Sequence, residues 1–542
     1  MSPLSLVAVG SCCISGLVTW RILNRRDVRG DYAFTAFAGV FGALYWTLRL
    51  GSNLPAREDL WRAFLLSMAY AGSIAFTTIC YRLSPFHPLA SFPGPLLWRI
   101  STLRLVACSY RGYRHLTIDS LHKKYGRFVR IGPNHLSINP PSAANALYSS
   151  PVMEKSHSYN SPGHVPGVSL FFKHTREEHT ARKRIWSSGF TANAFKQYCY
   201  PMDRRVWQLV QFLQDRSASG GVVDLAEHLA YWSYDFMGEM VFGGCNDLEL
   251  LRDGDKENLV GGGKMAMTLV DSVGQAPWLL DILWHLPASD DIHKLQQASE
   301  RMMKNRIKSK NVDIQDVASY LLAGDPATGD HIPEFELAID ALVAIQAGSD
   351  NTATILGLAF FFILSDPQVY QKIQAELDAQ FPDPKESPDL EKLAEIPYLN
   401  AVVHETLRLG TPFFLPRIVP SDGVNIDGVQ IPKGSIVALA AYTQQTSEEI
   451  FGPDPLTFRP ERWLEEDLNK PALVSFTSGR FVCIAKTFAM HELRFVLARL
   501  ILNLEIRFAP GFDIDLFRRG IRNMRTTVFD HPLLVTVAPR HA

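Results

Sequence analysis

The sequence predicts a mostly α-helical fold with small β-sheets, placed behind N-terminal transmembrane helices. Three observations support this prediction. Long windows without proline dominate the chain, whereas strand-like runs are short and lie beside Gly, Pro or Asn turns. Three apolar runs precede Tyr81. With 542 residues, 47% of them hydrophobic, the chain is long enough to bury a large core.

The overall composition excludes some classes of function. The net charge is −1, so there is no basic excess that would bind nucleic acid. The seven cysteines are an odd number, include no CxxC pair and show no ligand-like grouping with histidines, which argues against a disulfide framework or a zinc site. We therefore expect the main body to lie in a reducing compartment and to bind no nucleic acid.

The three apolar runs at the N-terminus cover residues 3–20, 32–48 and 63–80. Each is about 17 to 18 residues long, near the lower limit for crossing a bilayer. A cleaved signal peptide is the alternative for the first run, but that run lacks a basic n-region and two more apolar runs follow it. We expect three retained transmembrane helices.

The charges of the two connecting loops predict the orientation of these helices. In the second loop the arginines are offset by Glu58 and Asp59, whereas in the first loop Asp27 lies among several arginines. These arginines are Arg21, Arg25, Arg26 and Arg29. Because basic loops remain on the cytoplasmic side, we expect a lumenal N-terminus and a cytosolic body after Tyr81.

Residues 1–82 are thus expected to form a membrane anchor, and residues 83–98 a proline-rich tether that cannot continue a helix. The remainder, residues 99–542, shows no internal repeat, low-complexity tract or clean linker, so we expect one domain. Within it, "FVRIGPNHLSI" predicts two strands about a Gly-Pro-Asn turn, and "VNIDGVQIP" predicts a tight hairpin at Asp427-Gly428.

A long helix is predicted over residues 334–366, since Pro333 suits a helix start, Pro367 suits a stop, and no proline lies between them. A fourth membrane span is the alternative for its second half. That alternative would place Asp350 and Asn351 in hydrocarbon at a cost of several kcal/mol. We expect a buried soluble helix instead.

A run of polar residues follows Gly348 within this otherwise apolar helix. A glycine costs roughly 1 kcal/mol relative to alanine in a helix interior, and it is tolerable where a ligand approaches the backbone closely. Ser349, Asp350, Asn351 and Thr352 place a carboxylate and hydrogen-bonding groups next to that gap.

The stretch "FTSGRFVCIAK" places Cys483 directly before another long helix, predicted to start near Ile484 and to be apolar almost all round. Thiolate is a soft ligand for iron, and it is stabilised by backbone N–H groups of a glycine-containing loop and by a helix N-terminus. Gly479 and the following helix supply both. The alternative is that Cys483 is a small core residue, as free cysteines often are.

Two further motifs carry charge. In "HETLRL", Glu405 and Arg408 are three residues apart on one helical face and can pair; in "FRPERW", Arg462 can join the same network. The alternative for each is a solvated surface contact worth a few tenths of a kcal/mol.

With "AGSDNT", "ETLR", "PERW" and "FTSGRFVC" in this order, the chain resembles the cytochrome P450 superfamily of haem-thiolate monooxygenases from about Pro93 to the C-terminus. The resemblance implies a triangular, mostly α fold with the haem between the "AGSDNT" helix and the cysteine helix. Three preceding spans are similar to those of some fungal members in natural-product pathways.

Carried over residue by residue, the resemblance implies that Cys483 is the axial thiolate ligand of a haem b iron, a ligand that favours O–O cleavage. Phe476 of the same loop is expected to contact the haem. The resemblance also implies that Glu405, Arg408 and Arg462 form a structural charge network behind the haem.

The stretch "EEHTARKRIW" resembles the haem-flanking helix of the family, with His179 and Lys183 in the positions of its haem-contacting residues. Arg182 and Arg184 are neighbours that could serve instead. The alternative for this basic face is a solvated surface that docks an acidic redox partner, and both roles can hold together.

Two departures from the family pattern bear on the site. The arginine that usually lies two residues before the cysteine is replaced by Phe481, and the arginine stands one residue earlier as Arg480. Adjacent loop residues point in different directions, so Arg480 is not expected to reach a haem propionate. Arg417, in "FFLPRIVP", is expected to pair with the propionates together with His179 and Lys183.

The second departure lies in the acid-alcohol pair of the long helix. Asp350 is followed by Asn351, so the alcohol is absent from its usual place, and Thr352 lies about 100° further round the helix. Thr352 is therefore not expected to substitute directly. We expect Asp350 to supply protons through a water that Asn351 positions.

These residues together predict a membrane-bound monooxygenase that inserts oxygen from O2 into a lipophilic small molecule. We expect a role in secondary-metabolite biosynthesis, of a terpenoid or polyketide-like compound. The resemblance implies electrons from NADPH-cytochrome P450 reductase and a multi-pass location in the endoplasmic reticulum membrane. The alternatives are a haem-thiolate isomerase, dehydratase or peroxide-using enzyme, and a non-catalytic haem- or lipid-binding relic.

Overall fold

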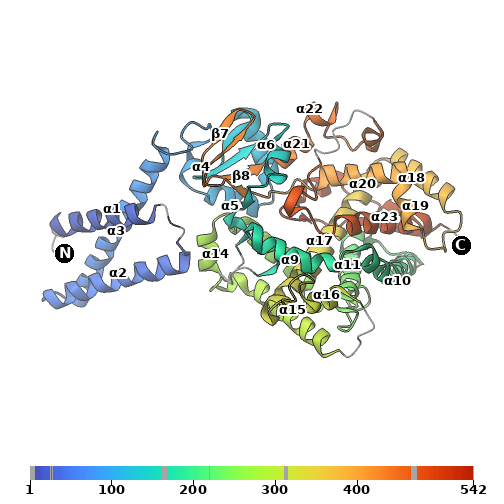
Figure 1. Ribbon diagram of the computed structural model, residues 1–542, viewed down its shortest axis with the longest axis horizontal. Coiled ribbons are helices and arrows are strands. Elements are labelled where there is room, and N and C mark those ends of the chain that lie inside the picture. The colour runs from blue at the N-terminus through green and yellow to red at the C-terminus, as the bar shows by residue number, and fades with distance from the viewer. Residues whose placement is uncertain are drawn as a thin grey trace.

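The computed structural model describes residues 6–540 except 25, 27, 161–167, 219, 310–314 and 466–472. Three N-terminal helices project from one side of a large helical body (Figure 1). The body holds small sheets at its edges, so the fold is mostly α with small β-sheets, as the sequence predicts.

The projecting helices are α1 (Leu6–Leu23), α2 (Gly30–Gly51) and α3 (Ala56–Leu83), and each overlaps one of the three predicted apolar runs. Both α1 and α2 pack against α3. Within the described part of the chain, four helices are long and apolar enough to cross a membrane: these three and α17 (Glu334–Ser365). Only α17 is largely buried in the body, which agrees with the prediction that it is a soluble core helix.

The proline-rich segment after α3 follows the surface of the body rather than extending freely. Its turns place Leu89 and Phe92 in an apolar cluster with strands of the largest sheet. Arg130 of that sheet donates a hydrogen bond to the carbonyl of Arg82 at the end of α3. The chain therefore passes directly from the third anchor helix into the body.

Most of the body is helical. In chain order its helices are α4 (Leu96–Ile100), α5 (Leu103–Tyr110), α6 (Arg114–Tyr125), α7 (Ala143–Tyr148), α8 (Ser169–Phe172), α9 (Arg176–Ser188), α10 (Ala192–Ala218), α11 (Leu225–Phe242), α12 (Leu250–Asp253), α13 (Leu259–Val273), α14 (Pro277–Leu283), α15 (Asp290–Lys308), α16 (Val317–Ala323), α17, α18 (Pro367–Gln380), α19 (Leu390–Glu395), α20 (Pro397–Gly410), α21 (Ala441–Gln445), α22 (Glu448–Phe451), α23 (Lys486–Asn503) and α24 (Ile514–Arg519).

Four small sheets, counted over the described residues, complete the body. The largest has the strand order β1-β2-β8-β5-β3, and its β2–β8 pair is parallel, whereas its other pairs are antiparallel. Antiparallel pairing also forms the sheet β4-β12-β9 and the hairpins β6–β7 and β10–β11. The strands are β1 (Phe128–Arg130), β2 (His135–Ile138), β3 (Glu154–Lys155), β4 (Val223–Asp224), β5 (Arg417–Ile418), β6 (Val424–Ile426), β7 (Val429–Ile431), β8 (Ile436–Leu439), β9 (Leu504–Phe508), β10 (Ile521–Asn523), β11 (Thr527–Phe529) and β12 (Leu534–Pro539).

Both hairpins predicted from the sequence are confirmed. β1 pairs with β2 across the Gly-Pro-Asn turn, and β6 pairs with β7 across Asp427-Gly428. The two turn residues have φ values of +49° and +78°, the left-handed conformation that a tight two-residue turn requires.

The core is organised around α17, which runs through the middle of the body and packs against α11, α15, α20 and α23. Pro333 and Pro367 flank it as predicted. α23 is buried along most of its length, but it begins at Lys486, two residues later than predicted. The difference arises because residues 483–486 form a separate turn, in which the carbonyl of Cys483 accepts a hydrogen bond from the Lys486 N–H.

Candidate active site

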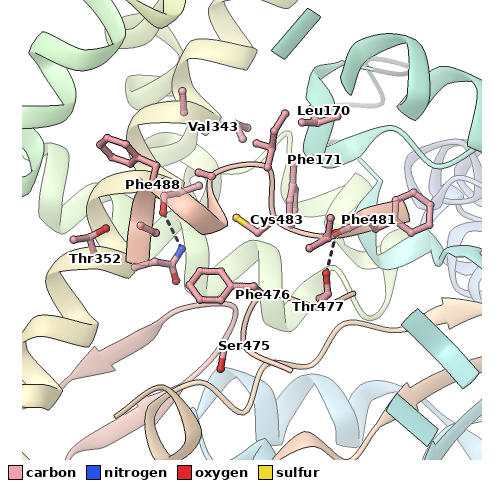
Figure 2. A pocket seen from close by; sticks show the side chains of 18 of the residues that line it. Leu170, Phe171, Val343, Thr352, Ser475, Phe476, Thr477, Phe481, Cys483 and Phe488 are labelled. Atoms are coloured by element: carbon pink, nitrogen blue, oxygen red, sulfur yellow. Dashed lines mark hydrogen bonds between the residues drawn. The ribbon is translucent and has the colours of Figure 1, made fainter. Parts of the chain in front are cut away.

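A cavity of about 320 Å³ lies between α17, α23 and the loop that carries Cys483. Side chains from α8, α9, α11, α16 and α20 complete its wall, so residues distant in sequence surround one space. Most of these side chains are apolar. Figure 2 shows Cys483 at the centre of this lining, with its sulfur turned into the cavity between the elements that carry Thr352, Phe476 and Phe488.

The loop holding Cys483 is tightly fixed. Gly479 has a φ of +66°, and a Cβ at this position would lie 2.4 Å from the carbonyl oxygen of Tyr148, so only glycine fits. The hydroxyl of Thr477 donates to the carbonyl of Phe481 at 2.9 Å, and the N–H of Cys483 donates to the carbonyl of Phe476 at 3.0 Å. The sulfur is thereby held in one position.

The electrostatic surroundings of the thiol are mixed. Cys483 retains accessible surface, and its sulfur faces the cavity. Burial raises the pKa of this thiol, whereas the Ala485 N–H and the charges of Lys183 and Lys486 act in the opposite direction. The loop alone thus favours the thiolate only partly, and a bound cation would complete its stabilisation.

One end of the cavity is strongly cationic. Lys155, Arg417 and Arg525 all line it, together with His179 and Tyr159. Among the described residues, His179 Nδ1, Arg417 Nε and Arg525 Nη1 have no hydrogen-bond partner although they are buried. Buried donors without partners are costly, so this end of the cavity is suited to an anionic ligand.

Sequence reasoning missed Lys155 and Arg525. Lys155 lies on β3, where its Nζ donates to the carbonyls of Leu170 and Phe171 at 3.2 and 2.7 Å. Burial lowers the pKa of Lys155 well below its usual value, and Arg417 and Arg525 lower it further. Neither residue belongs to a recognised motif, and the polar residues around Lys155 in the sequence give no sign that it is buried.

Neither Lys183, which was expected to help hold the propionates, nor Arg480, the displaced arginine of the cysteine loop, lines the cavity. The Nζ of Lys183 donates to the carbonyl of Arg480 at 3.0 Å, and the guanidinium of Arg480 donates to the carbonyl of Pro151 at 2.8 Å. Lys183 therefore connects α9 to the cysteine loop. The neighbouring Arg182 pairs with Glu336 and Asp340 of α17, and Arg184 pairs with Asp325.

His179 faces the cavity from α9. Its ring packs edge-on against Phe481, with centroids 4.7 Å apart. Burial, followed by the charges of Lys155 and Lys183, lowers the pKa of His179 to about 3. His179 is therefore neutral and can contribute a hydrogen bond but no charge.

The middle of α17 departs from the prediction at Asp350. This carboxylate does not line the cavity; it accepts a hydrogen bond from the Tyr234 hydroxyl of α11 at 3.0 Å. Burial raises the pKa of Asp350 to about 7, against the lowering effects of Tyr234 and Lys264. Gly348 lines the cavity, but it also packs on Met237, whose Cε would lie 2.5 Å from a Cβ at this position.

Asn351 and Thr352 do line the cavity. The Asn351 amide donates to the Ala347 carbonyl at 3.0 Å, and its Oδ1 has no partner among the described residues. Thr352 donates to Glu492 of α23 at 3.1 Å. Burial raises the pKa of Glu492 to about 8, so the acid beside the cavity comes from α23 and was not anticipated from the sequence.

Glu405, Arg408 and Arg462 meet behind the cysteine loop in a network without solvent exposure. Glu405 accepts hydrogen bonds from Arg408 at 2.7 Å and from Arg462 at 2.9 Å, and also from the Arg459 N–H and the Trp463 indole at 2.9 Å. The remaining arginine donors bind backbone carbonyls. The alternative considered from the sequence, a solvated surface contact between Glu405 and Arg408, is wrong because both side chains are fully buried.

Comparison with known proteins agrees with this site. The chain matches the family described as Cytochrome P450 over residues 91–522. It is 30% identical over 517 residues to "Cytochrome P450 67" of Uromyces fabae, covering 91% of this chain and 94% of the relative. The chain therefore belongs to the cytochrome P450 family.

Two other relatives come from fungi of the genus Aspergillus. The chain is 32% identical to "Cytochrome P450 monooxygenase notG'" of Aspergillus versicolor, with coverage of 84% of this chain and 85% of the relative. It is 31% identical to "Tryprostatin B 6-hydroxylase" of Aspergillus fumigatus, with coverage of 83% and 80%.

Family membership makes the chain a monooxygenase with a haem-thiolate iron cofactor. The residues present fit this cofactor on chemical grounds. A cysteine sulfur faces the cavity, apolar side chains line most of the wall, and buried donors without partners lie at one end. These features suit an iron, a macrocycle and carboxylate side chains, respectively.

Proposed function

We propose that the enzyme binds haem b with Cys483 as the axial ligand and inserts one oxygen atom of O2 into a lipophilic small molecule of secondary metabolism. The observation that carries this proposal is the fixed position of the Cys483 sulfur in the wall of an apolar cavity with a cationic end. One relative, named as a tryprostatin B 6-hydroxylase, supports oxygen insertion into a natural product. A terpenoid or polyketide-like substrate remains our prediction.

Each group of residues has a distinct task in this proposal. Bound haem supplies the iron centre that activates dioxygen. Arg417 and His179 hold its propionates through donors that otherwise lack partners, and Lys155 adds a positive charge beside them. Apolar side chains such as Phe476 and Phe488 exclude water from the cavity, which strengthens the electrostatic interactions within it.

The proton-handling residues differ from those expected on sequence grounds. Asn351 lines the cavity, and its Oδ1, which has no partner among the described residues, can turn to accept a hydrogen bond from a water held there. Asp350 is separated from the cavity and is bound to Tyr234. We therefore assign the positioning of water to Asn351. Asp350 does not contact the cavity directly and is assigned the role of proton donor to that water.

The proposed redox partner is NADPH-cytochrome P450 reductase, and the proposed location is the endoplasmic reticulum membrane with a cytosolic catalytic domain. The start of α2 supports this orientation. The Gly30 N–H donates to the carboxylate of Asp281 in α14 at 2.8 Å, and a Cβ on Gly30 would lie 1.7 Å from the Trp278 carbonyl. The loop between α1 and α2 thus lies on the same side of the anchor as the catalytic body.

Engineered glycosylation acceptors test this topology. Acceptors near the N-terminus and in the second loop, around residue 53, should be modified in the lumen. An acceptor placed next to Arg26, in the first loop, should remain unmodified. Modification of the first loop without the other two would reverse the orientation and overturn the cytosolic location.

The catalytic proposal is tested by comparing metabolites of a fungal host with and without the chain under isotopically labelled dioxygen. We expect at least one new lipophilic product that carries a single labelled oxygen atom. The host that expresses Cys483→Ser at the same protein level should lack this product. A product without the label, or one that persists in Cys483→Ser, would contradict monooxygenation at this site.

A haem-thiolate isomerase, dehydratase or peroxide-using enzyme is retained as the second candidate on one observation. The carboxylate of Asp350 is occupied by Tyr234, and an amide replaces the usual alcohol at Asn351. An enzyme that needs no proton delivery to dioxygen would lose nothing by this arrangement. Product formation without consumption of reductant would favour this candidate.

A further inference from the structure

Arg525 lies at the tip of the hairpin β10–β11, which inserts between α17 and the end of α20. The hairpin is fixed on both sides. Thr527 donates its hydroxyl to the Gly410 carbonyl at 2.7 Å, and Thr354 of α17 donates to the Thr527 carbonyl at 3.2 Å. The Arg525 side chain is 3% exposed and lines the cavity.

The guanidinium of Arg525 is only partly satisfied. Its Nη2 donates to the Ser158 carbonyl at 2.6 Å. Its Nε lies 3.5 Å from a carboxylate oxygen of Asp271 without making a hydrogen bond. Its Nη1 has no partner among the described residues, which leave out 161–167. A buried guanidinium with open donors is costly unless a ligand completes its hydrogen bonds.

Asp271 does not neutralise Arg525 on its own. This fully buried carboxylate of α13 pairs more closely with Arg114 of α6, at 2.9 Å. Arg114 is also buried, so one negative charge is shared between two arginines. The group of Arg114, Asp271 and Arg525 therefore carries one positive charge in excess.

Besides Arg525, the cavity is lined by the cations Lys155 and Arg417, and haem has two propionates. Lys155 Nζ and the Arg417 guanidinium each lie 5.1 Å from the ring centroid of Phe481 in the cysteine loop. All three cations lie over Tyr159, but Arg525 is nearest its ring centroid, at 4.6 Å against 5.4 Å for Lys155 and 5.9 Å for Arg417, and Arg525 alone of the three pairs with Asp271 of α13. After two propionates pair with Lys155 and Arg417, the excess charge at Arg525 remains without a counter-ion.

We propose that Arg525 binds a carboxylate of the substrate, so that the substrate is a lipophilic carboxylic acid. The proposal rests on the function proposed above. The acid end binds the Arg525 guanidinium, which lines the cavity and has an unpartnered donor among the described residues, and the hydrocarbon part contacts the apolar wall that includes Leu170, Phe171 and Val343. A charge-assisted hydrogen bond of this kind is stronger than a neutral one, and it also removes the cost of a buried donor without a partner.

The experiment uses the full-length, haem-loaded protein in detergent and a matched pair of probes, dodecanoate and methyl dodecanoate. Each probe is titrated at neutral pH while the shift of the Soret band reports binding. We expect the wild-type protein to bind the acid about tenfold more tightly than the ester. In Arg525→Gln this preference should disappear through weaker binding of the acid, whereas binding of the ester and the haem content per protein stay unchanged.

Two variants serve as controls. Arg417→Gln should lower the haem content, because Arg417 is assigned to a propionate. Arg525→Lys keeps the charge but shortens the side chain, so it should weaken acid binding and leave ester binding unaltered; it also tests the proposal if Arg525→Gln does not fold.

Three results would overturn the proposal: equal binding of acid and ester by the wild type, an acid preference that survives both Arg525 variants, or a loss of haem from Arg525→Gln as large as that from Arg417→Gln. The last result would assign Arg525 to the haem. The carbon monoxide spectrum of each preparation separates these results from a failure of the proposed function, since that failure removes the thiolate band from the wild type itself.

Discussion

The molecule contains two buried clusters of charged residues that differ in how completely their hydrogen bonds are made. Around Glu405, every charged group meets an opposite charge or a backbone carbonyl, and its three side chains are fully buried. At the cationic end of the cavity, Arg417 and Arg525 are equally buried, but each retains a donor without a partner among the described residues. The first cluster is complete by itself, whereas the second is completed by a ligand.

This difference separates a structural role from a binding role. Burial opposes ionisation of Glu405, but hydrogen bonds and charge from Arg408, together with Arg462, outweigh it and hold the pKa of Glu405 below its ordinary value. At the cavity, cations adjoin cations, and the pKa of Lys155 falls well below its ordinary value because of burial and because of Arg417 and Arg525. A region built of like charges is unfavourable for the fold and is explained by the anion it binds.

Removal of the central acid of the complete cluster should have the largest effect. Glu405→Ala leaves Arg408 and Arg462 buried without a counter-ion, which costs about 3–5 kcal/mol of folding free energy. We expect little folded protein, measured as yield after purification and as thermal unfolding of whatever remains. Glu449→Ala is the matched control, because Glu449 pairs with Arg127 on the surface and its loss should change neither quantity. Wild-type stability in Glu405→Ala would show that the cluster is not structural.

The incomplete cluster should respond through ligand retention rather than folding. Arg417→Ala is expected to lower the haem retained per protein several-fold, because a propionate loses its buried partner. Arg480→Ala should lower it little, since Arg480 binds the Pro151 carbonyl outside the cavity. The haem content of each variant, measured from the absorbance of the purified protein, distinguishes the roles of the two arginines. Equal or reversed losses would show that the cysteine loop rearranges and that Arg480 reaches the haem.

A smaller effect is expected from Glu492, a buried acid that has a hydroxyl partner but no cation. Burial raises the pKa of Glu492 from an ordinary 4.5 to about 8. A raised pKa stabilises the fold below the unfolded value, and this contribution is lost as pH rises through the folded value. Glu492→Gln should therefore match the wild type in Tm at about pH 5 and exceed it by a few degrees at about pH 8. A difference in Tm that is independent of pH would show that Glu492 does not titrate in this range.

The smallest expected change concerns coupling rather than stability. Asn351→Ala removes the amide that is proposed to position a water in the cavity, so reductant consumption should continue while product falls and hydrogen peroxide rises. Asn351→Thr should keep most of the product formed per reductant. The ratio of product to reductant, measured with a reductase and any accepted substrate, tests this. An unchanged ratio in Asn351→Ala would exclude the residue from oxygen activation and favour the non-oxygenating candidate.

Local sequence patterns were sufficient for residues whose neighbours in the chain determine their place. The position of Cys483 follows from a glycine loop before a buried helix, and the meeting of Glu405 with Arg408 follows from helical spacing. The hairpins and the bounds of α17 were also predictable, because turn residues and prolines mark them.

Other parts of the site depend on contacts between distant segments, which the sequence alone does not reveal. Lys155 and Arg525 come from β3 and from the β10–β11 turn, and only tertiary packing brings them to one cavity. Asp350 was expected to serve the cavity, but Tyr234 of α11 binds its carboxylate. Glu492 was missed because helix periodicity gives no sign that α23 presents an acid to Thr352.

The central claim, that the Cys483 sulfur is the ligand for which the cavity is built, is tested most directly by the reduced, carbon-monoxide-bound spectrum. The account predicts the strongly red-shifted Soret band of thiolate-ligated haem in the wild type and in Cys245→Ser, whose cysteine lies away from the cavity. Cys483→Ser should lose that band. A red-shifted band that persists in Cys483→Ser would contradict the assignment.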